Sequence, residues 1–169
     1  MYTRVTRVQE SPEAIDAGIA FFKEKVVPMA KAAPGNTGVI LLVDRKTGAG
    51  MGITVWATAQ ALSASEQMGI SSRTQSVAAT GGSIVNVERG EQVIMERAQP
   101  PMVGSFVRLN TVAGDPKKID NAIKFVEQQV LPTLKALKGF RALKGGAARC
   151  RMKRRPLIRL VYKKLFQGF

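Results

Sequence analysis

Histidine is absent from all 169 residues of this chain. Its absence excludes the Ser-His and Cys-His pairs that activate a nucleophile, because both use an imidazole as the base. It also excludes histidine as a general acid or base near neutral pH and as a ligand of haem or a metal. The sequence therefore supplies no catalytic residue that stands out, and the reaction, if there is one, is unknown from the residues alone.

Cysteine is nearly absent as well. Cys150 stands alone, which excludes an internal disulfide, and the chain has no cysteine or histidine cluster from which a zinc or iron–sulfur site is built. We therefore expect no metal and no cofactor. The first residues alternate like a strand and not like a signal peptide, and no apolar run reaches the ~18 residues of a transmembrane helix. A cytoplasmic location is the expectation.

Acidic residues are missing from one part of the chain only. The net charge of +14 suggests nucleic-acid binding until its location is considered. Residues 141–169 hold ten basic residues and no acidic one, which leaves 16 basic and 12 acidic residues in the rest of the chain. The body of the protein is thus electrostatically ordinary, and the C-terminal tail is strongly basic.

A β-hairpin is predicted within residues 38–58. The apolar run Val39–Val43 and the alternating segment Gly52–Trp56 both have the length of a strand. Between them, Asp44 and the glycines of Asp44–Gly50 provide the side-chain capping and the positive φ that a tight reversal needs. With 45% hydrophobic residues, the chain has enough apolar side chains for a core around this hairpin.

The segments around the hairpin predict a ferredoxin-like fold. A strand is expected over residues 3–8, and Ser11-Pro12 begins a helix whose apolar residues recur every three or four positions. A second helix is expected from Thr58 to about Ala79, and a final strand over residues 83–95. The order is βαββαβ, which gives an α+β protein with one antiparallel sheet and helices on one of its faces.

An internal repeat follows this unit. A shift of 104 residues, without a gap, aligns residues 4–35 with residues 108–139 at twelve identical positions, including a proline late in the helix. After Phe140-Arg141 the similarity stops, so we expect a truncated second copy. The predicted domains are the complete repeat 1–97, a linker 98–104, a partial repeat of strand and helix 105–141, and a basic amphipathic tail 142–169.

The segment PGNTGVILLVDRKTGAGMGITVWATAQAL, residues 34–62, resembles the antibiotic-biosynthesis-monooxygenase-like (ABM-like) family of dimeric α/β barrels. The resemblance covers residues 2–97 and, partially, 105–141. It implies two paired ferredoxin-like units and an activity from a set that includes cofactor-free oxygenases, haem-degrading enzymes and isomerases. The axial histidine of the haem-degrading members has no counterpart. Oxygenase members use a strand tryptophan, matched by Trp56, and an asparagine, whose place is taken by Gly52.

Five residues are candidates to line a pocket. Trp56 can stack on a flat substrate between helix and sheet, although packing in the core is the favoured interpretation. Phe22 and Met29 are candidates for the pocket wall, with simple helix packing as the alternative. Arg4 and Arg108 occupy equivalent positions in the two repeats and are candidates to hold an anionic group; solvated strand charges explain them equally well.

The tail has four competing interpretations. Helical spacing from Pro156 places its apolar residues on one face and basic residues opposite, behind the basic cluster Arg149–Arg155. Residues 149–169 would then bind nucleic-acid phosphates or an anionic membrane. Alternatively, the apolar face covers part of the sheet, or the abrupt change in composition marks a shifted reading frame. The last two interpretations are favoured because a binding helix does not explain why the repeat breaks off.

Two hypotheses of function remain open. The first is a cofactor-independent, monooxygenase-like enzyme that acts on a small, flat organic molecule in a hydrophobic cavity beside Trp56. The second is a non-enzymatic binding or stress-related protein that uses the fold as a dimerisation scaffold. In both, we expect a homodimer formed through the sheet face, because the incomplete second copy is too short to cover the first sheet alone.

Overall fold

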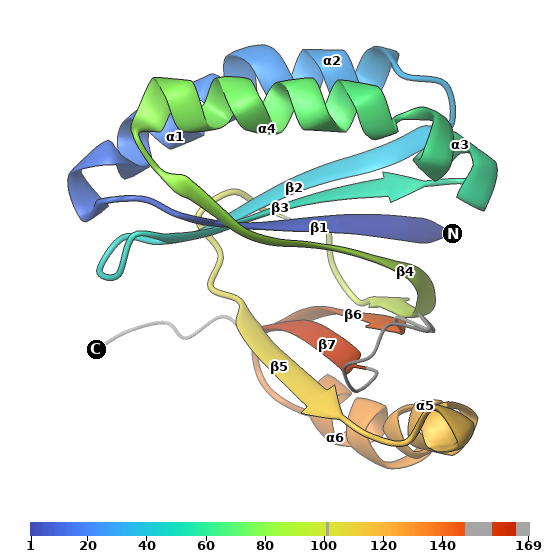
Figure 1. Ribbon diagram of the computed structural model, residues 1–169. Helices are drawn as coiled ribbons and strands as arrows, with labels where there is room; N and C mark the ends of the chain where they lie inside the picture. Colours follow the sequence, from blue (N-terminus) through green and yellow to red (C-terminus); the bar gives the residue numbers. More distant parts are fainter. Residues whose placement is uncertain (101, 148–156, 165–169) are drawn as a thin grey trace. The chain divides into compact units, whose positions relative to one another are not determined.

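The computed structural model describes residues 1–100, 102–147 and 157–164, and the chain divides into two compact units, Met1–Arg89 and Gly90–Phe169. Both units combine antiparallel strands with helices (Figure 1). The predicted α+β class with a ferredoxin-like antiparallel sheet is confirmed. No helix of the described residues is both long and apolar enough to span a membrane.

The first unit contains the predicted hairpin at the edge of its sheet. The strands are β1 (Tyr2–Gln9), β2 (Asn36–Asp44), β3 (Ala49–Trp56) and the first part of β4 (Ser83–Arg97), in the order β2-β3-β1-β4. The pairs β2/β3 and β1/β3 are antiparallel, and Val5 lies opposite Ile53 at the centre of the second pair. Side chains alternate between the two faces of each strand, so β1 and β3 each present one set of residues to the helices.

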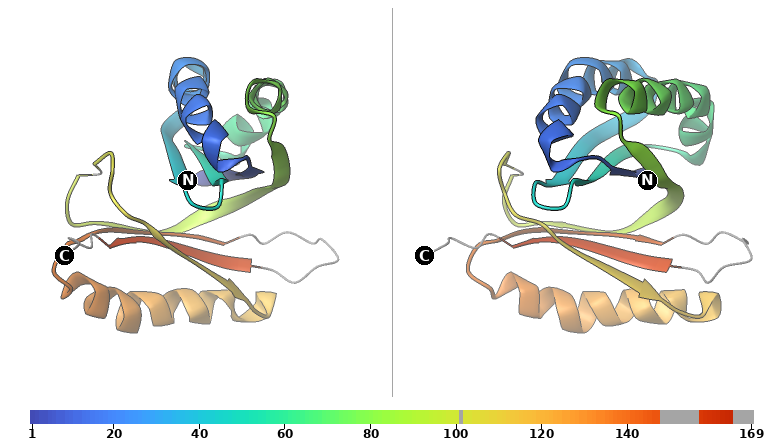
Figure 2. Two further views of the ribbon diagram at one scale, coloured as in Figure 1. Left: turned by 90° about the vertical axis from the view of Figure 1, so that its left-hand side faces the viewer. Right: turned by 60° about the vertical axis from the view of Figure 1, so that its left-hand side comes forward.

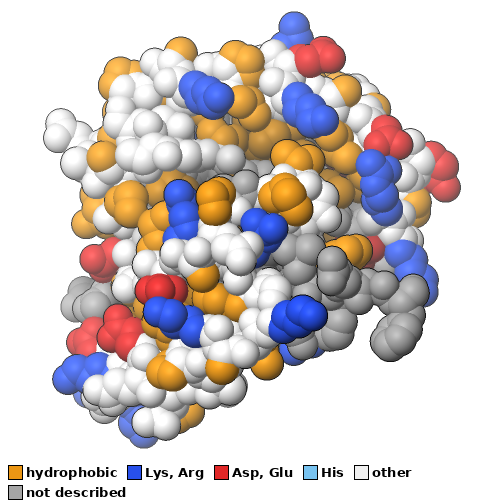
Figure 3. Space-filling model, turned by 180° about the vertical axis from the view of Figure 1, so that it is seen from behind, with side chains coloured by type: hydrophobic (Ala, Val, Ile, Leu, Met, Phe, Trp, Pro, Cys, Tyr) orange, Lys and Arg blue, Asp and Glu red, His pale blue; other side chains and the backbone are white. Residues whose placement is uncertain are grey.

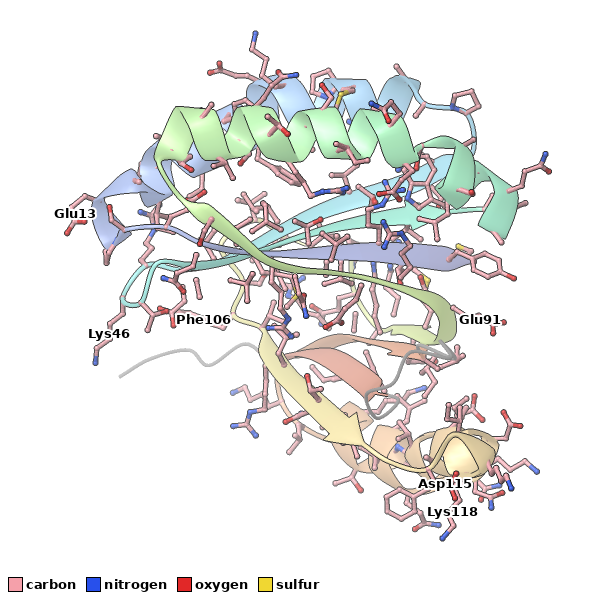
Figure 4. All side chains as sticks on the ribbon, viewed as in Figure 1. Glu13, Lys46, Glu91, Phe106, Asp115 and Lys118 are labelled. Atoms are coloured by element: carbon pink, nitrogen blue, oxygen red, sulfur yellow. The ribbon has the colours of Figure 1, made fainter. Side chains whose placement is uncertain are left out.

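The hairpin turn depends on Asp44 and Gly48, as the sequence predicts. The Asp44 Oδ1 atom accepts hydrogen bonds from the backbone N–H groups of Lys46 (2.9 Å) and Thr47 (3.3 Å). Gly48 has φ +75°, and a Cβ atom there would lie 1.9 Å from the Glu10 carbonyl oxygen. Only glycine fits this position. Lys46 points away from the turn into solvent (Figure 4).

The helices of the first unit lie side by side on one face of its sheet (Figure 2). They are α1 (Ile15–Phe21), α2 (Val27–Ala32), α3 (Ala59–Ala64) and α4 (Glu66–Thr80). The predicted second helix is thus present but interrupted at Ser65. Its start is capped by the Thr58 hydroxyl, which accepts from the N–H of Ala61, and its end by Gly81 at φ +66°.

Between α1 and α2 the chain forms a π-helical segment, Phe22–Val26. There the Val27 N–H donates to the Phe22 carbonyl, five residues earlier. Pro28 follows at once and has no N–H to donate, which favours a local change of the hydrogen-bond register. A π-helical segment of one turn of this kind is uncommon and often lies at a functional site. The second unit repeats it at Val126–Val130, ahead of Pro132.

The second unit contains β5 (Arg108–Ala113), α5 (Ile119–Phe125), α6 (Leu131–Lys135), β6 (Phe140–Ala147) and β7 (Leu157–Lys164), together with the end of β4. Its strand order is β4-β6-β7-β5. The core of the second unit is formed by buried side chains of β4, β6, α6 and the π-helical segment Val126–Val130. These are Ile94, Val126, Leu134, Phe140 and Leu143.

The helix expected from Pro156 is wrong. Residues Leu157–Lys164 form β7, which pairs antiparallel with both β5 and β6, so Val161 lies opposite Leu109 on one side and Lys144 on the other. The second copy therefore continues beyond Arg141 with two strands. The rest of the proposed binding segment, 149–156 and 165–169, lies outside the described residues.

The beginning of the predicted linker, residues 98–104, is hydrogen-bonded to β6. β4 extends to Arg97, and the N–H groups of Ala98 and Gln99 both donate to the Arg141 carbonyl, at 2.8 and 3.0 Å. These two hydrogen bonds fix the beginning of the predicted linker against β6.

On the face drawn in Figure 3, Lys and Arg side chains are interspersed with acidic, hydrophobic and uncharged ones, as expected for a body of nearly balanced charge.

Candidate functional site

A cavity of about 100 Å³ lies between the sheet and the helices of the first unit. One wall is formed by β1, where alternate residues face the same side of the sheet. These residues are Arg4, Thr6 and Val8, and Glu10, which lies one residue beyond the end of β1, also lines the cavity. The apolar lining comes mainly from α1, the π-helical segment, α2 and the edge strand β2. It consists of Ile15, Phe22, Val26, Met29, Leu41 and Val43.

The π-helical segment supplies part of the cavity wall. Phe22 begins this segment, Val26 ends it, and Met29 follows one turn later. All three line the cavity, together with the buried Ala30. A π turn adds a residue to the helical repeat and so rotates the side chains that follow it. The proline-induced change in register thus helps to determine which face of the helix meets the cavity.

Glycines on β3 make room for the helix side chains. A Cβ atom on Gly52 would lie 3.3 Å from the Phe22 ring, and one on Gly50 would lie 2.5 Å from a methyl group of Val8. The position where the resemblance implies an asparagine is thus occupied by Gly52 with the Phe22 ring beside it. An asparagine side chain does not fit there unless Phe22 moves.

Arg4 lies at one end of the cavity and is 4% exposed. Its Nη2 atom donates to the Leu62 carbonyl (2.8 Å), the Ser65 hydroxyl (3.0 Å) and Glu66 Oε2 (3.0 Å). Its Nη1 atom makes one longer bond of 3.4 Å to the Ser65 carbonyl. Burial lowers the pKa of Arg4, and the carboxylate of Glu66 partly offsets that effect. The Nε atom has no hydrogen-bond partner in the described part of the chain.

Glu66, at the start of α4, contacts three guanidinium groups. Besides Arg4, Arg73 Nη2 lies 3.0 Å from Oε1, and Arg89 Nη2 lies 2.5 Å from the same atom. Hydrogen bonding by Arg89 and the charges of the arginines lower the pKa of Glu66 to about 2, although burial acts in the opposite direction. Glu66 is therefore ionised at any physiological pH and is unsuited to exchanging protons with a substrate.

Trp56 is fully buried, with 0% exposure, and does not line the cavity. Its indole N–H donates to the Thr54 hydroxyl at 2.9 Å, and the guanidinium carbon of Arg4 lies 5.9 Å from the ring centroid. This is the geometry of a cation–π contact. The cavity wall next to the tryptophan is therefore formed by Arg4 and Thr54, and Trp56 lies behind them.

The other predicted residues fall in different places. Arg4, Phe22 and Met29 all line the cavity, whereas Arg108 lies in β5 of the second unit, opposite Tyr162 of β7. The sequence reasoning missed Glu10 and Arg73, which also line the cavity. Glu10 had a detectable signal, because it continues, one residue beyond the end of β1, the alternation that begins at Arg4. The described residues contain no group of three or more Cys, Asp and Glu side chains placed to bind a metal ion.

Arg73 comes from a helix whose pattern is weak. Small residues recur on the cavity side of α4 every three or four positions, namely Gly69, Ser72 and Ser76. A helix face of small side chains leaves a space next to the sheet, and this was the signal that could have identified the cavity. This signal can be recognised in the sequence only when the spacing of small residues along a helix is examined as well as the spacing of apolar ones.

Comparison with known proteins supports the fold and leaves the activity open. No family model matches the chain. Two uncharacterised proteins of Mycobacterium tuberculosis (strain CDC 1551) are 34% and 31% identical over 140 residues, which is 83% of this chain. These 140 residues make up 62% and 59% of the relatives. The chain thus spans about three fifths of the length of the proteins it matches.

Solved structures share the arrangement of strands and helices. A candidate monooxygenase from Lactobacillus acidophilus superimposes with a TM-score of 0.68 at 10% identity, covering 96% of this chain and 76% of that chain. An anthrone oxidase-like protein superimposes with a TM-score of 0.66 at 14% identity, covering 98% of this chain and 74% of that chain. A candidate monooxygenase from Fusobacterium nucleatum superimposes with a TM-score of 0.60 at 13% identity, covering 96% of this chain and 76% of that chain. The chain has a monooxygenase-like fold, and at these identities the likeness extends to the fold alone.

Proposed function

We propose that this chain is a monooxygenase-like protein whose first unit binds a small, flat organic molecule in the cavity beneath α4. The observation that supports this most directly is the cavity itself. It is mainly apolar, it has a few polar groups at defined positions, and it lies between the helix layer and the sheet, which together are typical of a ligand site.

An aromatic side chain in the wall favours a flat ligand. Phe22 and Met29 both line the cavity, and a planar ring that lies against the Phe22 side chain gains stacking contacts. Thr6 and Thr54 add hydroxyl groups that can bond to a substituent on the ring.

The proposed reaction needs O2 and a substrate that supplies all the electrons. For a methylene carbon between aromatic or carbonyl groups, two C–H bonds break, one oxygen atom becomes the oxygen of a new carbonyl group, and the other leaves as water. The carbon gives up four electrons, and O2 accepts them. The protein would bind and orient the substrate and exclude bulk water from it.

The test is oxygen consumption with anthrone and with smaller ring compounds that carry an activated methylene group. The expected result is an initial rate above the spontaneous rate in buffer. Ser72→Leu should abolish that excess, because Ser72 lines the cavity and the leucine side chain fills it. Ser71→Leu is the matched control, since Ser71 is exposed on the same helix. Equal rates for the two variants would contradict the proposal.

A non-enzymatic binding protein is the second candidate. It is favoured by the composition of the lining: among the described residues Glu10 is its one carboxylate, and Glu66, which pairs with Arg4 and Arg73, is fixed in its ionised form. Saturable binding of the ring compounds that Ser72→Leu abolishes, with oxygen consumption at the spontaneous rate throughout, would establish this function in place of the enzymatic one.

We also propose that the protein is a homodimer. The helices of the first unit lie on one face of its sheet (Figure 2), and we expect the second chain to pair through the other face. Size-exclusion chromatography with light scattering at micromolar concentration should give twice the chain mass of 18.3 kDa. A stable, folded monomer would contradict this assembly.

A further inference from the structure

We propose that the ligand of the first unit's cavity carries a carboxylate and that Arg4 and Arg73 bind it. The inference rests on the proposed use of the cavity as a ligand site and specifies the class of ligand, an aromatic carboxylate. It does not depend on whether the ligand is then oxidised.

Arg4 has unused hydrogen-bonding capacity at the cavity. A guanidinium has five N–H donors. In Arg4 the short bonds all come from Nη2, the single bond of Nη1 is 3.4 Å long, and Nε has no partner in the described part of the chain. A buried donor without an acceptor is unfavourable. A carboxylate in the cavity would provide the missing acceptor.

Arg73 lies next to Arg4 and is also mostly buried, with 15% of its side chain exposed. The two side chains approach the same glycine. A Cβ atom on Gly69 would lie 2.8 Å from Arg4 Nη1 and 3.1 Å from Arg73 Nη1. The absence of a side chain at position 69 therefore lets both guanidinium groups lie against α4, at the same end of the cavity.

Arginines outnumber carboxylates in the ion pairs at this end of the cavity. Arg4, Arg73 and Arg89 all pair with the carboxylate of Glu66. Glu10 lies six residues after Arg4 in the chain, which corresponds to about 20 Å of extended chain. It is too far away to neutralise the arginines. Buried positive charge next to an apolar space attracts an anion more strongly than the same charge in water.

The rest of the cavity determines the other part of the ligand. Beyond the arginines the lining is apolar and includes Phe22, Val26 and Met29. A carboxylate attached directly to an aromatic ring satisfies both regions, because the ring lies against Phe22 while the two oxygens face the guanidinium groups. Arginine is well suited to this role, since its planar fork matches the geometry of a carboxylate.

The test compares benzoate with benzamide, which has nearly the same shape and no charge. Trp56 is the single tryptophan of the chain and contacts Arg4, so its fluorescence reports binding at this end of the cavity. Benzoate should bind at least about tenfold more tightly than benzamide, as expected for charge-assisted hydrogen bonds to a buried site. Arg73→Gln should remove most of this preference.

Arg89→Gln is the matched control. Arg89 contacts the same carboxylate of Glu66 but does not line the cavity, so the preference for benzoate should persist. Equal affinities for benzoate and benzamide in the wild-type protein would overturn the inference and leave the cavity proposal intact. A preference lost in Arg89→Gln and kept in Arg73→Gln would overturn the assignment of Arg73. Absence of binding for both compounds would contradict the inference and the cavity proposal together.

Discussion

The guanidinium group of Arg4 lies over the ring of Trp56, with 5.9 Å between the guanidinium carbon and the ring centroid. Arg4 begins the series of cavity-facing residues on β1, and Trp56 ends β3. The same guanidinium reaches α3 and α4 through Leu62, Ser65 and Glu66. One buried side chain therefore connects the sheet, the helix layer and the cavity.

The first prediction concerns this connection. Arg4→Met should destabilise the first unit by roughly 3 kcal/mol, because it removes one member of a buried, hydrogen-bonded charge cluster. Arg45→Met is the control, since the Arg45–Asp16 pair is exposed to solvent and should contribute much less to the stability of the fold. Urea unfolding followed by Trp56 fluorescence measures both. Equal losses would show that the Arg4 network contributes no more than a surface pair.

The second prediction concerns pH. The pKa of Glu66 falls from 4.5 to about 2 on folding, so the folded protein favours the ionised carboxylate. The resulting stability is fully present above pH 4.5 and is lost as the pH falls toward 2. The difference in unfolding free energy between the wild type and Glu66→Gln should therefore narrow from pH 6 to pH 3. A difference that does not change with pH would contradict the low pKa.

The third prediction separates two effects at left-handed glycines. Gly81→Ala should cost about 1 kcal/mol, the usual penalty of a positive φ for a residue with a Cβ atom, because nothing lies within 4 Å of that position. Gly48→Ala should cost at least about 2 kcal/mol, because it adds a clash with the Glu10 carbonyl to the same penalty. Thermal unfolding of the two variants measures the difference. Equal costs would show that the turn adjusts to the extra methyl group.

The fourth prediction tests the strand that replaces the expected helix. β7 lies between β5 and β6, so each backbone N–H of its interior is available to one neighbour. Val161→Pro removes one such N–H and should destabilise the second unit by about 3 kcal/mol or more. Hydrogen exchange should become faster in β6 and stay unchanged in the hairpin β2–β3. Unaltered protection of β6 would contradict the pairing with β7.

The hairpin was predictable because its signals are local. Asp44 and Gly48 fix the turn through their own hydrogen bonds and backbone conformation, and the flanking strands are rich in β-branched residues. The same reasoning failed for β6 and β7. In β6 the buried positions Leu143, Gly145 and Ala147 do alternate with half-buried ones, but the two adjacent glycines, Gly145 and Gly146, hide that alternation in the sequence.

The cavity was predictable only on the sides formed by large residues. Phe22 and Met29 stand out by their size and spacing, and Arg4 by its recurrence in the repeat. Arg73 and Gly69 do not, because their role depends on the packing of α4 against β1, which brings together residues far apart in the chain. Trp56 is buried in the core, which was the favoured interpretation of the sequence, and it does not line the cavity.

The most direct test of the account is an NMR titration of the wild-type protein with benzoate, in which the amide resonances of the whole chain are followed. The account predicts saturable shifts confined to the cavity lining of the first unit, with Arg4, Phe22, Gly52, Gly69 and Arg73 among the residues that move most. Shifts located in the second unit, or small shifts spread over the surface without saturation, would contradict it.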